Sequence, residues 1–372
     1  MHVIDVKDLA GLLNILSARG YTLVGPAVQQ GVIVYDVISS VEDLPRGWVD
    51  DQEPAAYSLR RSEEETYFEY VVGPHSWKQF LYPPRLRVLL AQKAGKGFET
   101  VPDETETPRY AFIGVRPCDL QAIAVQDKVF ATGEYVDPTY ADRREKAFVV
   151  AVNCTRPGGN CFCTSMGTGP RATSNFDLVL TEVRSGGSHT FVVESGSERG
   201  SSVLAEMPHR PAEQREIDEV NRVMNEAAGR MGKTLESGTV RQLLNENLDS
   251  PHWDDVAKRC LACTNCTMVC PTCFCSTVED VTDLAGDSAQ RVRRWDSCFT
   301  AEFTKIAGGN IRLTIRSRYR QWLMHKLAHW VDQFGVFGCV GCGRCITWCP
   351  VGIDITSEVD RIRQAHAPAS KA

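Results

Sequence analysis

The chain has 372 residues, of which 43% are hydrophobic and 24% are charged, as in an average globular protein. This composition excludes wholesale disorder, and the length allows two or three domains. The net charge of -6 argues against nucleic-acid binding, and no apolar run approaches the ~20 residues that span a bilayer.

The chain contains fifteen cysteines, and its first residues, Met1–Asp8, lack the basic and apolar regions of a secretory signal. In a large chain of this kind, thiols serve metals more often than they form disulfides. We therefore expect a cytoplasmic protein whose cysteines hold metal.

Residues 1–205 have the element pattern of an α/β domain. Apolar residues at helical spacing predict a helix over Val6–Ala18. Residues 42–66, rich in Pro, Gly and acidic side chains, predict a loop. Runs of β-branched and aromatic residues predict strands over 32–38, 67–72, 110–115, 147–152, 176–183 and 189–194.

Four cysteines lie close to the ends of the apolar strands at 110–115 and 147–152, where an α/β sheet binds its ligands. They are Cys118, Cys154, Cys161 and Cys163. Gly158 and Gly159 allow close approach of the backbone to a cluster. Three interpretations stay open: a third iron–sulfur cluster, a zinc site, or buried thiols.

A nucleotide site is not indicated in this part. Neither G-x-G-x-x-G nor G-x-x-x-x-G-K-[ST] occurs, and Pro170 interrupts the glycine-rich stretch at 167–170, which reads as a turn. We therefore expect neither flavin nor NAD(P) in this chain.

Residues 206–257 predict a helical connector, with apolar residues at helical spacing over 211–231 and 235–248. Ser250 and Pro251 then predict the start of a further helix.

Residues 258–366 contain the pattern C-x2-C-x2-C-x3-C-P twice, which is the bacterial run for 4Fe-4S clusters. The fourth cysteine of such a run usually binds the other cluster of a pair. We expect one cluster on Cys260, Cys263, Cys266 and Cys349. We expect the second on Cys339, Cys342, Cys345 and Cys270. Structural zinc sites, the alternative, do not call for the third cysteine and the closing proline.

The residues between these two cysteine motifs read as helices, the longest from Arg312 to Phe334. Its basic residues predict either a solvated face or a docking face for an acidic partner. They are Arg316, Arg318, Arg320, His325, Lys326 and His329. A helix beginning at Thr356 closes this part, and residues 367–372 predict a disordered tail.

Six other residues near the motifs have open roles. Lys258, Arg259 and Arg344 either offset the negative charge of a cluster or are surface charges. The remaining thiols pack beside a cluster or substitute for a ligand, and the sequence does not decide between these. They are Cys273, Cys275 and Cys298.

Three segments together carry a family resemblance: the Cys118 segment, the run from Cys161 to Pro170, and Arg294-Trp-Asp-Ser-Cys-Phe. The chain resembles the beta (iron–sulfur) subunit of soluble sulfhydrogenase-type nickel–iron hydrogenases. More distantly, it is similar to the electron-transfer subunit of anaerobic sulfite reductase. The resemblance spans about Leu9 to Ile362.

The resemblance implies an α+β chain with a C-terminal α-helical ferredoxin-like dicluster domain. It also implies a non-catalytic relay between the catalytic subunit of a hydrogenase or sulfite reductase and an FAD- and NAD(P)-binding flavoprotein subunit. The sequence agrees, because we find no acid/base pair or open metal site that indicates an enzyme. An iron–sulfur transcription regulator, the third class, is disfavoured by the acidic charge.

Overall fold

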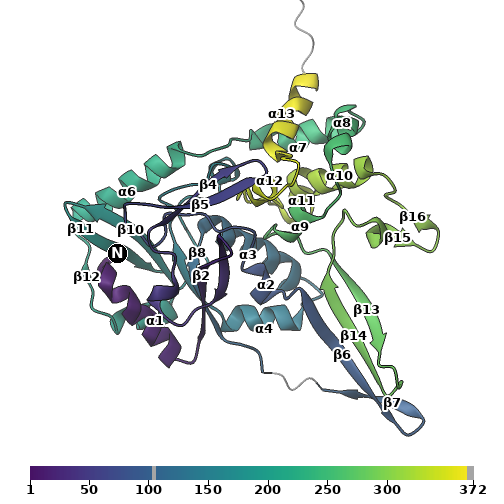
Figure 1. Ribbon diagram of the computed structural model, residues 1–372, viewed down its shortest axis with the longest axis horizontal. Helices are drawn as coiled ribbons and strands as arrows, with labels where there is room; N and C mark the ends of the chain where they lie inside the picture. The colour runs from purple at the N-terminus through teal and green to yellow at the C-terminus, as the bar shows by residue number, and fades with distance from the viewer. Residues whose placement is uncertain (103–105, 367–372) are drawn as a thin grey trace, which may run out of the picture.

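The computed structural model describes residues 1–102 and 106–366, and the predicted disordered tail, residues 367–372, lies outside them. Helices and strands are mixed along the chain, which confirms the α+β class (Figure 1).

The N-terminal part is built on an eight-stranded sheet with the order β12-β1-β11-β10-β9-β8-β2-β3. The four strands β10, β9, β8 and β2 run parallel, and the outer pairs are antiparallel. All of β9 is buried, as expected for a parallel strand covered on both faces. The bounds are β1 His2–Asp5, β2 Thr22–Gln29, β3 Val32–Val37, β8 Tyr110–Val115, β9 Phe148–Val152, β10 Leu178–Ser185, β11 Ser188–Ser195 and β12 Arg210–Pro211.

Helices cover this sheet along apolar stripes that the sequence predicts. In α1, Leu9, Leu12, Leu13 and Leu16 are buried, which confirms the predicted helical period. In α6, Val220 and Met224 pack against valines of β1, β10 and β11. The bounds are α1 Leu9–Ala18, α2 Lys78–Leu81, α3 Pro117–Phe130, α4 Pro138–Lys146, α5 Glu198–Ala205 and α6 Gln214–Gly229.

A second hydrophobic core lies in the C-terminal part, where Trp253, Trp322, Leu323 and Val359 are buried and several motif cysteines pack against them. Its helices are α7 Ser237–Glu246, α8 His252–Arg259, α9 Asn265–Met268, α10 Ile315–Met324, a π-helical turn His325–His329, α11 Trp330–Phe334, α12 Arg344–Thr347 and α13 Ile355–His366. The domain boundaries at residues 205 and 257 stay predictions.

A four-stranded antiparallel sheet, ordered β13-β14-β6-β7, extends away from the body (Figure 1). Its strands are β6 Arg85–Ala94, β7 Gly97–Val101, β13 Ser276–Thr282 and β14 Ser288–Trp295. The helical prediction between the cysteine motifs is therefore wrong for residues 276–295. β13 and β14 form a hairpin with each other, and β14 also pairs with β6, almost 200 positions earlier in the chain, a partner that a local pattern does not report. A short pair, β15 Lys305–Ile306 and β16 Gly309–Asn310, follows.

Two predictions for residues 42–72 are also wrong. The expected loop contains a hairpin of β4 Trp48–Glu53 and β5 Ala56–Arg61. Residues 67–72 do not form the expected strand. Their backbone N–H groups donate to carboxylate side chains and not to a neighbouring strand. The backbone N–H groups of Tyr67 and Phe68 donate to the Glu182 carboxylate at 2.8 and 2.9 Å. The N–H of Val71 donates to Asp50 at 2.6 Å.

A buried ion pair joins the two parts of the molecule. Arg344 of α12 donates to both carboxylate oxygens of Asp119 in α3, at 2.7 and 2.9 Å, and Tyr35 donates to the same carboxylate at 3.1 Å. The side chains of Arg344 and Asp119 are 3% and 1% exposed. The alternative in which Arg344 is a surface charge is therefore wrong.

Replacing Asp119 with Leu leaves the Arg344 guanidinium buried without its counter-charge. We expect this change to lower the free energy of unfolding by about 3–5 kcal/mol, measured by urea denaturation at constant iron content. The control is Asp280→Leu, which removes an exposed partner of Arg291 and should leave the free energy of unfolding almost unchanged, because water screens this pair. Equal losses in the two variants would contradict a structural role for the buried pair.

Candidate metal centres

The first group of cysteines combines both motifs. Three thiols of the first motif and Cys349 of the second line one pocket, which Cys345 also borders. The three first-motif thiols are Cys260, Cys263 and Cys266. Backbone N–H groups point at two of the four sulfurs: Ala262 donates to Cys260 Sγ at 3.4 Å and Ile353 to Cys349 Sγ at 3.3 Å. The fold thus brings together the four residues expected to hold the first cluster.

The second group has the reciprocal composition. Burial is the largest cause of the raised pKa of Cys345. The nearby thiols of Cys339, Cys342 and Cys270 are the next largest causes, and each raises this pKa further. Cys270, from the first motif, therefore lies among the three cysteines of the second. The tight turns at Gly341 and Gly343, with φ of 64° and 74°, keep this loop compact, because glycine adopts positive φ without strain.

Cys270 differs from the other motif cysteines in its charged surroundings. The Cys273 thiol and then the Lys326 ammonium hold the pKa of Cys270 well below its usual value, although burial acts in the opposite direction. For Cys266, Cys339 and Cys345, burial is the largest effect and raises the pKa. Metal binding to this second group thus starts from one sulfur that already favours the thiolate.

A third group collects at the carboxyl edge of β8 and β9. Cys118 is the second residue of α3, Cys154 follows β9, and Cys161 and Cys163 are buried in the next loop. Burial raises the pKa of all four thiols, and the neighbouring thiols raise it further for Cys118, Cys161 and Cys163. Burial is the largest of these effects at each of the four thiols.

The third group lies directly against the loop of the second. The N–H of Phe162 donates to Gly341 O at 2.8 Å, and Cys161 Sγ lies 3.8 Å from Cys342 O. A Cβ atom added at Gly343 would come within 2.4 Å of Asn160 O. These contacts leave no room for a side chain between the two loops.

The donor set of each group fits an iron–sulfur cluster. No group of three or more His, Cys, Asp or Glu side chains within residues 1–102 and 106–366 is spaced to hold a single metal ion. The four thiolates of a cubane each bind a different iron atom, so they do not need to converge on one point.

Comparisons with known proteins agree with this arrangement. Residues 259–353 match the 4Fe-4S dicluster domain family. The chain is 33% identical over 290 residues to sulfhydrogenase 2 subunit beta of Pyrococcus furiosus, and the match covers 77% of this chain and 82% of that protein. The chain belongs to the sulfhydrogenase beta-subunit family. It is accordingly an iron–sulfur, electron-transfer protein. No solved structure matches the chain, and no helix among the described residues has the length and apolarity to cross a membrane.

The remaining thiols of this family member share one cavity. Cys273, Cys275 and Cys298 line a space of about 370 Å³ together with Lys326 and aromatic side chains. The thiol of Cys298 lowers the pKa of Cys275 to about 7. These three cysteines therefore form a separate sulfur-lined cavity beside Cys270.

Of the basic residues predicted to form one solvated or docking face, Lys326 does not lie on a surface, whereas Arg316, Arg318, Arg320 and His329 are partly or fully exposed. Lys326 is only 4% exposed, and its ammonium contacts Cys270 Sγ at 3.0 Å and Cys273 Sγ at 3.3 Å. Arg318 and Arg320 donate to the carbonyl oxygens of Phe299 and Leu248. The sequence gives no signal for the π-helical turn that holds Lys326.

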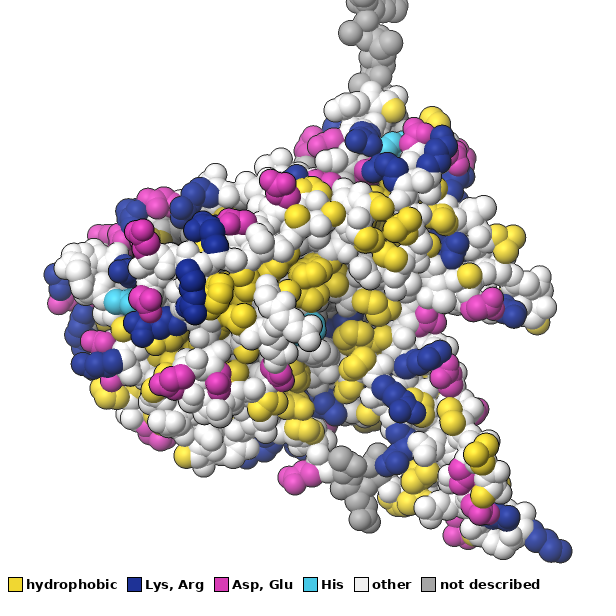
Figure 2. Space-filling model, in the orientation of Figure 1, with side chains coloured by type: hydrophobic (Ala, Val, Ile, Leu, Met, Phe, Trp, Pro, Cys, Tyr) yellow, Lys and Arg dark blue, Asp and Glu magenta, His cyan; other side chains and the backbone are white. Residues whose placement is uncertain are grey.

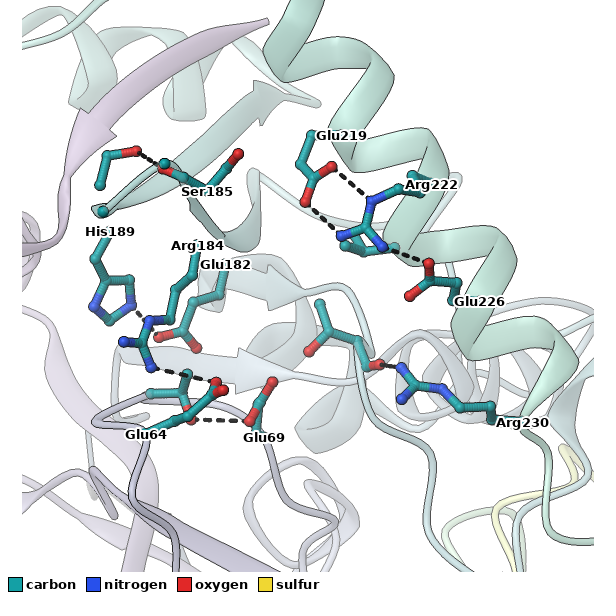
Figure 3. A pocket seen from close by; sticks show the side chains of 16 residues that line it. Glu64, Glu69, Glu182, Arg184, Ser185, His189, Glu219, Arg222, Glu226 and Arg230 are labelled. Atoms are coloured by element: carbon teal, nitrogen blue, oxygen red, sulfur yellow. Dashed lines mark hydrogen bonds and ion pairs between the residues drawn. The ribbon is translucent and has the colours of Figure 1, made fainter.

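A second cavity, of about 410 Å³, lies between the β10–β11 hairpin, α6 and residues 64–69 (Figure 3). Its charged side chains pair with one another: Arg184 with Glu64, His189 with Glu182, and Arg222 with Glu219 and Glu226. Because Glu182 also holds the backbone of Tyr67 and Phe68, we assign this network to the fold.

The contact between the second and third cysteine groups is tested with Gly343→Ala. We expect reduced stability and impaired iron loading, because the new Cβ meets Asn160 O and the backbone requires positive φ. The control is Gly335→Ala, which has a φ of 72° but no atom within 4 Å of the new Cβ. Thermal unfolding and iron content of the two variants isolate the clash. Equal effects would show that the loops do not depend on this contact.

Proposed function

We propose that this chain is the electron-transfer subunit of a soluble nickel–iron hydrogenase of the sulfhydrogenase type. In this proposal it relays single electrons through two 4Fe-4S clusters, between a flavoprotein subunit that uses NAD(P)H and the catalytic subunit. Each cluster accepts and releases one electron, with a potential set by hydrogen bonds, charge and exposure. The chain itself binds neither flavin nor NAD(P) and performs no catalysis.

The observation that carries this proposal is the exchange of the fourth cysteines. Cys349 lies with the first motif and Cys270 with the second, as paired 4Fe-4S clusters require. This supports one cluster on Cys260, Cys263, Cys266 and Cys349, and another on Cys339, Cys342, Cys345 and Cys270. Two adjacent clusters form a path for electrons rather than an isolated structural metal site.

The first group also has a route to a partner. Cys263 is exposed, and Leu261 and Val351, which border the same pocket, are 61% and 40% exposed. Figure 2 shows apolar side chains gathered over the C-terminal lobe, which contains α8, α10 and α13 (Figure 1). An apolar surface next to an exposed ligand supports docking of a redox partner at this edge.

A third cluster on Cys118, Cys154, Cys161 and Cys163 is supported by the position of Arg116. This guanidinium is 2% exposed and lies 3.7 Å from Cys154 Sγ. It also donates to the carbonyl oxygens of Phe68 and Tyr70, and no carboxylate among the described residues forms an ion pair with it. A buried cation requires nearby negative charge, which thiolates bound to a cluster would supply.

The similarity to a sulfhydrogenase subunit favours a hydrogenase over an anaerobic sulfite reductase as the catalytic partner. We place the complex in the cytoplasm, where reducing conditions keep thiols available for metal. All fifteen cysteines are free in the structure, in agreement with that environment.

The crossed arrangement is tested with Cys349→Ser in anaerobically purified protein. We expect loss or alteration of the cluster held by Cys260, Cys263 and Cys266, because its fourth thiolate is missing. Electron paramagnetic resonance of the reduced protein should show two interacting signals in the parent chain and one changed signal in the variant. Damage confined to the cluster of Cys339 would contradict the crossed ligand assignment.

The third cluster is tested by iron analysis. Three 4Fe-4S clusters bind about twelve irons per chain, and two bind about eight. We expect Cys154→Ser to lower the parent's iron content by about four, whereas Cys275→Ser, the control, should leave it unchanged. Eight irons in the parent would exclude a third 4Fe-4S cluster, and eight irons with one zinc would identify the zinc alternative.

The proposed assembly is tested by affinity purification of the tagged chain from native cells. We expect a flavoprotein and hydrogenase subunits to copurify, while the isolated chain, once chemically reduced, should pass electrons to dyes but should not consume hydrogen. A flavin spectrum from the isolated chain, or copurification of a sulfite reductase, would contradict the proposal.

A further inference from the structure

Two lysines from different parts of the molecule converge on Cys270. Lys326 donates to Cys270 Sγ at 3.0 Å and to Thr272 Oγ1 at 3.4 Å. Lys78 of α2 donates to the carbonyl oxygens of Met268 and Cys270, at 3.4 and 3.1 Å, and its ammonium lies 3.9 Å from the Trp295 ring centroid. Both lysines are 4% exposed. Two positive charges are thus held out of water around one cysteine.

Neither lysine has an acidic partner in the part of the chain that the structure describes. Among the described residues, no carboxylate forms an ion pair with either ammonium, whereas the equally buried Arg344 has Asp119. An ammonium is costly to bury unless negative charge lies close by. Cysteine sulfurs are the anionic atoms available here, because Lys326 contacts both Cys270 and Cys273.

The backbone holds Lys326 in this position. It lies in the π-helical turn His325–His329, a rare form that often marks functional sites. Its carbonyl oxygen accepts a hydrogen bond from Gly338 N at 2.9 Å, and its ammonium lies 3.5 Å from Gly338 O. Since Gly338 immediately precedes Cys339, Lys326 is fixed to the second motif at two points.

The two cysteine groups therefore differ electrostatically. The sulfurs of Cys260 and Cys349 accept hydrogen bonds from neutral backbone N–H groups, whereas Cys270 Sγ accepts one from a buried ammonium. Arg318, the cation whose field acts on Cys260, is partly exposed and therefore screened by water. Lys326 also acts on Cys266, but its direct contact is with Cys270.

We propose that Lys326, in contact with Cys270, gives the cluster held by Cys270 the higher reduction potential of the two. Reduction adds one electron to an already anionic site, and a buried positive charge stabilises the added negative charge. Lys326 then acts through Cys270 and is not itself a catalytic residue. Because the second cluster has the higher potential, it is the cluster that holds the electron for longer during the relay. The inference rests on the proposed function, because it requires Cys270 to be a ligand.

The test is a potentiometric titration of the complete chain, followed by electron paramagnetic resonance. Cys263→Ser, which changes an exposed ligand of the first cluster, assigns the two signals. In Lys326→Gln we expect the second cluster to titrate at a more negative potential, with a smaller shift for the first. Lys326→Arg, which keeps the charge, should recover most of the difference. Lys258→Met is the matched control, because its side chain is 75% exposed, and it should shift neither signal.

Iron content separates the two proposals. Full iron loading with unchanged potentials in Lys326→Gln would overturn the inference while leaving the relay intact. An equal shift of both clusters would also overturn it. Selective loss of either cluster in Lys326→Gln would overturn it, because the lysine would then serve cluster loading and not the potential. A parent chain without two cluster signals would instead contradict the proposed function.

Discussion

Buried positive charge beside cysteine sulfur is the constraint on which the centre of this protein depends. Lys326, Lys78 and Arg116 are nearly inaccessible to water, and no carboxylate among the described residues forms an ion pair with them. Such groups destabilise a fold unless negative charge is nearby. In the proposed arrangement, thiolates and the clusters they would hold supply that charge, so cluster loading and folding should stabilise each other. Arg344 follows the same rule with a different partner, because the Asp119 carboxylate balances it.

The dicluster domain and the α/β part are interlocked. Asp119 of α3 binds Arg344 inside the second motif, and Lys78 of α2 reaches the first. The loop at residues 160–163 lies against Gly341 and Gly343, where no side chain fits. The N-terminal part therefore supplies both charge and contact surface to the two cysteine motifs. If its own four cysteines hold metal, the adjoining loops form a continuous electron path into the dicluster domain.

The sheet of β13, β14, β6 and β7 stands apart from this centre. Val292 is the one buried side chain within the four strands, and acidic, basic and apolar side chains mix along the sheet (Figure 2). Its strands come from both sides of the first cysteine motif in the sequence. The sheet thus ties the segment between the two motifs to the N-terminal part, and Trp295 at the end of β14 packs against the N-terminal core.

The sequence alone determined what depends on local pattern and covalent spacing. Two C-x2-C-x2-C-x3-C-P runs identified the candidate cluster cysteines, apolar periodicity predicted α1 and α6, and runs of β-branched and aromatic residues predicted the central strands. Tertiary structure decided what depends on distant partners. The pairing of β14 with β6 replaced expected helices, and the Glu182 carboxylate, not a strand, holds residues 67 and 68. The π-helical turn moved Lys326 from an expected surface position into the core, because one wider turn changes the face on which a side chain lies.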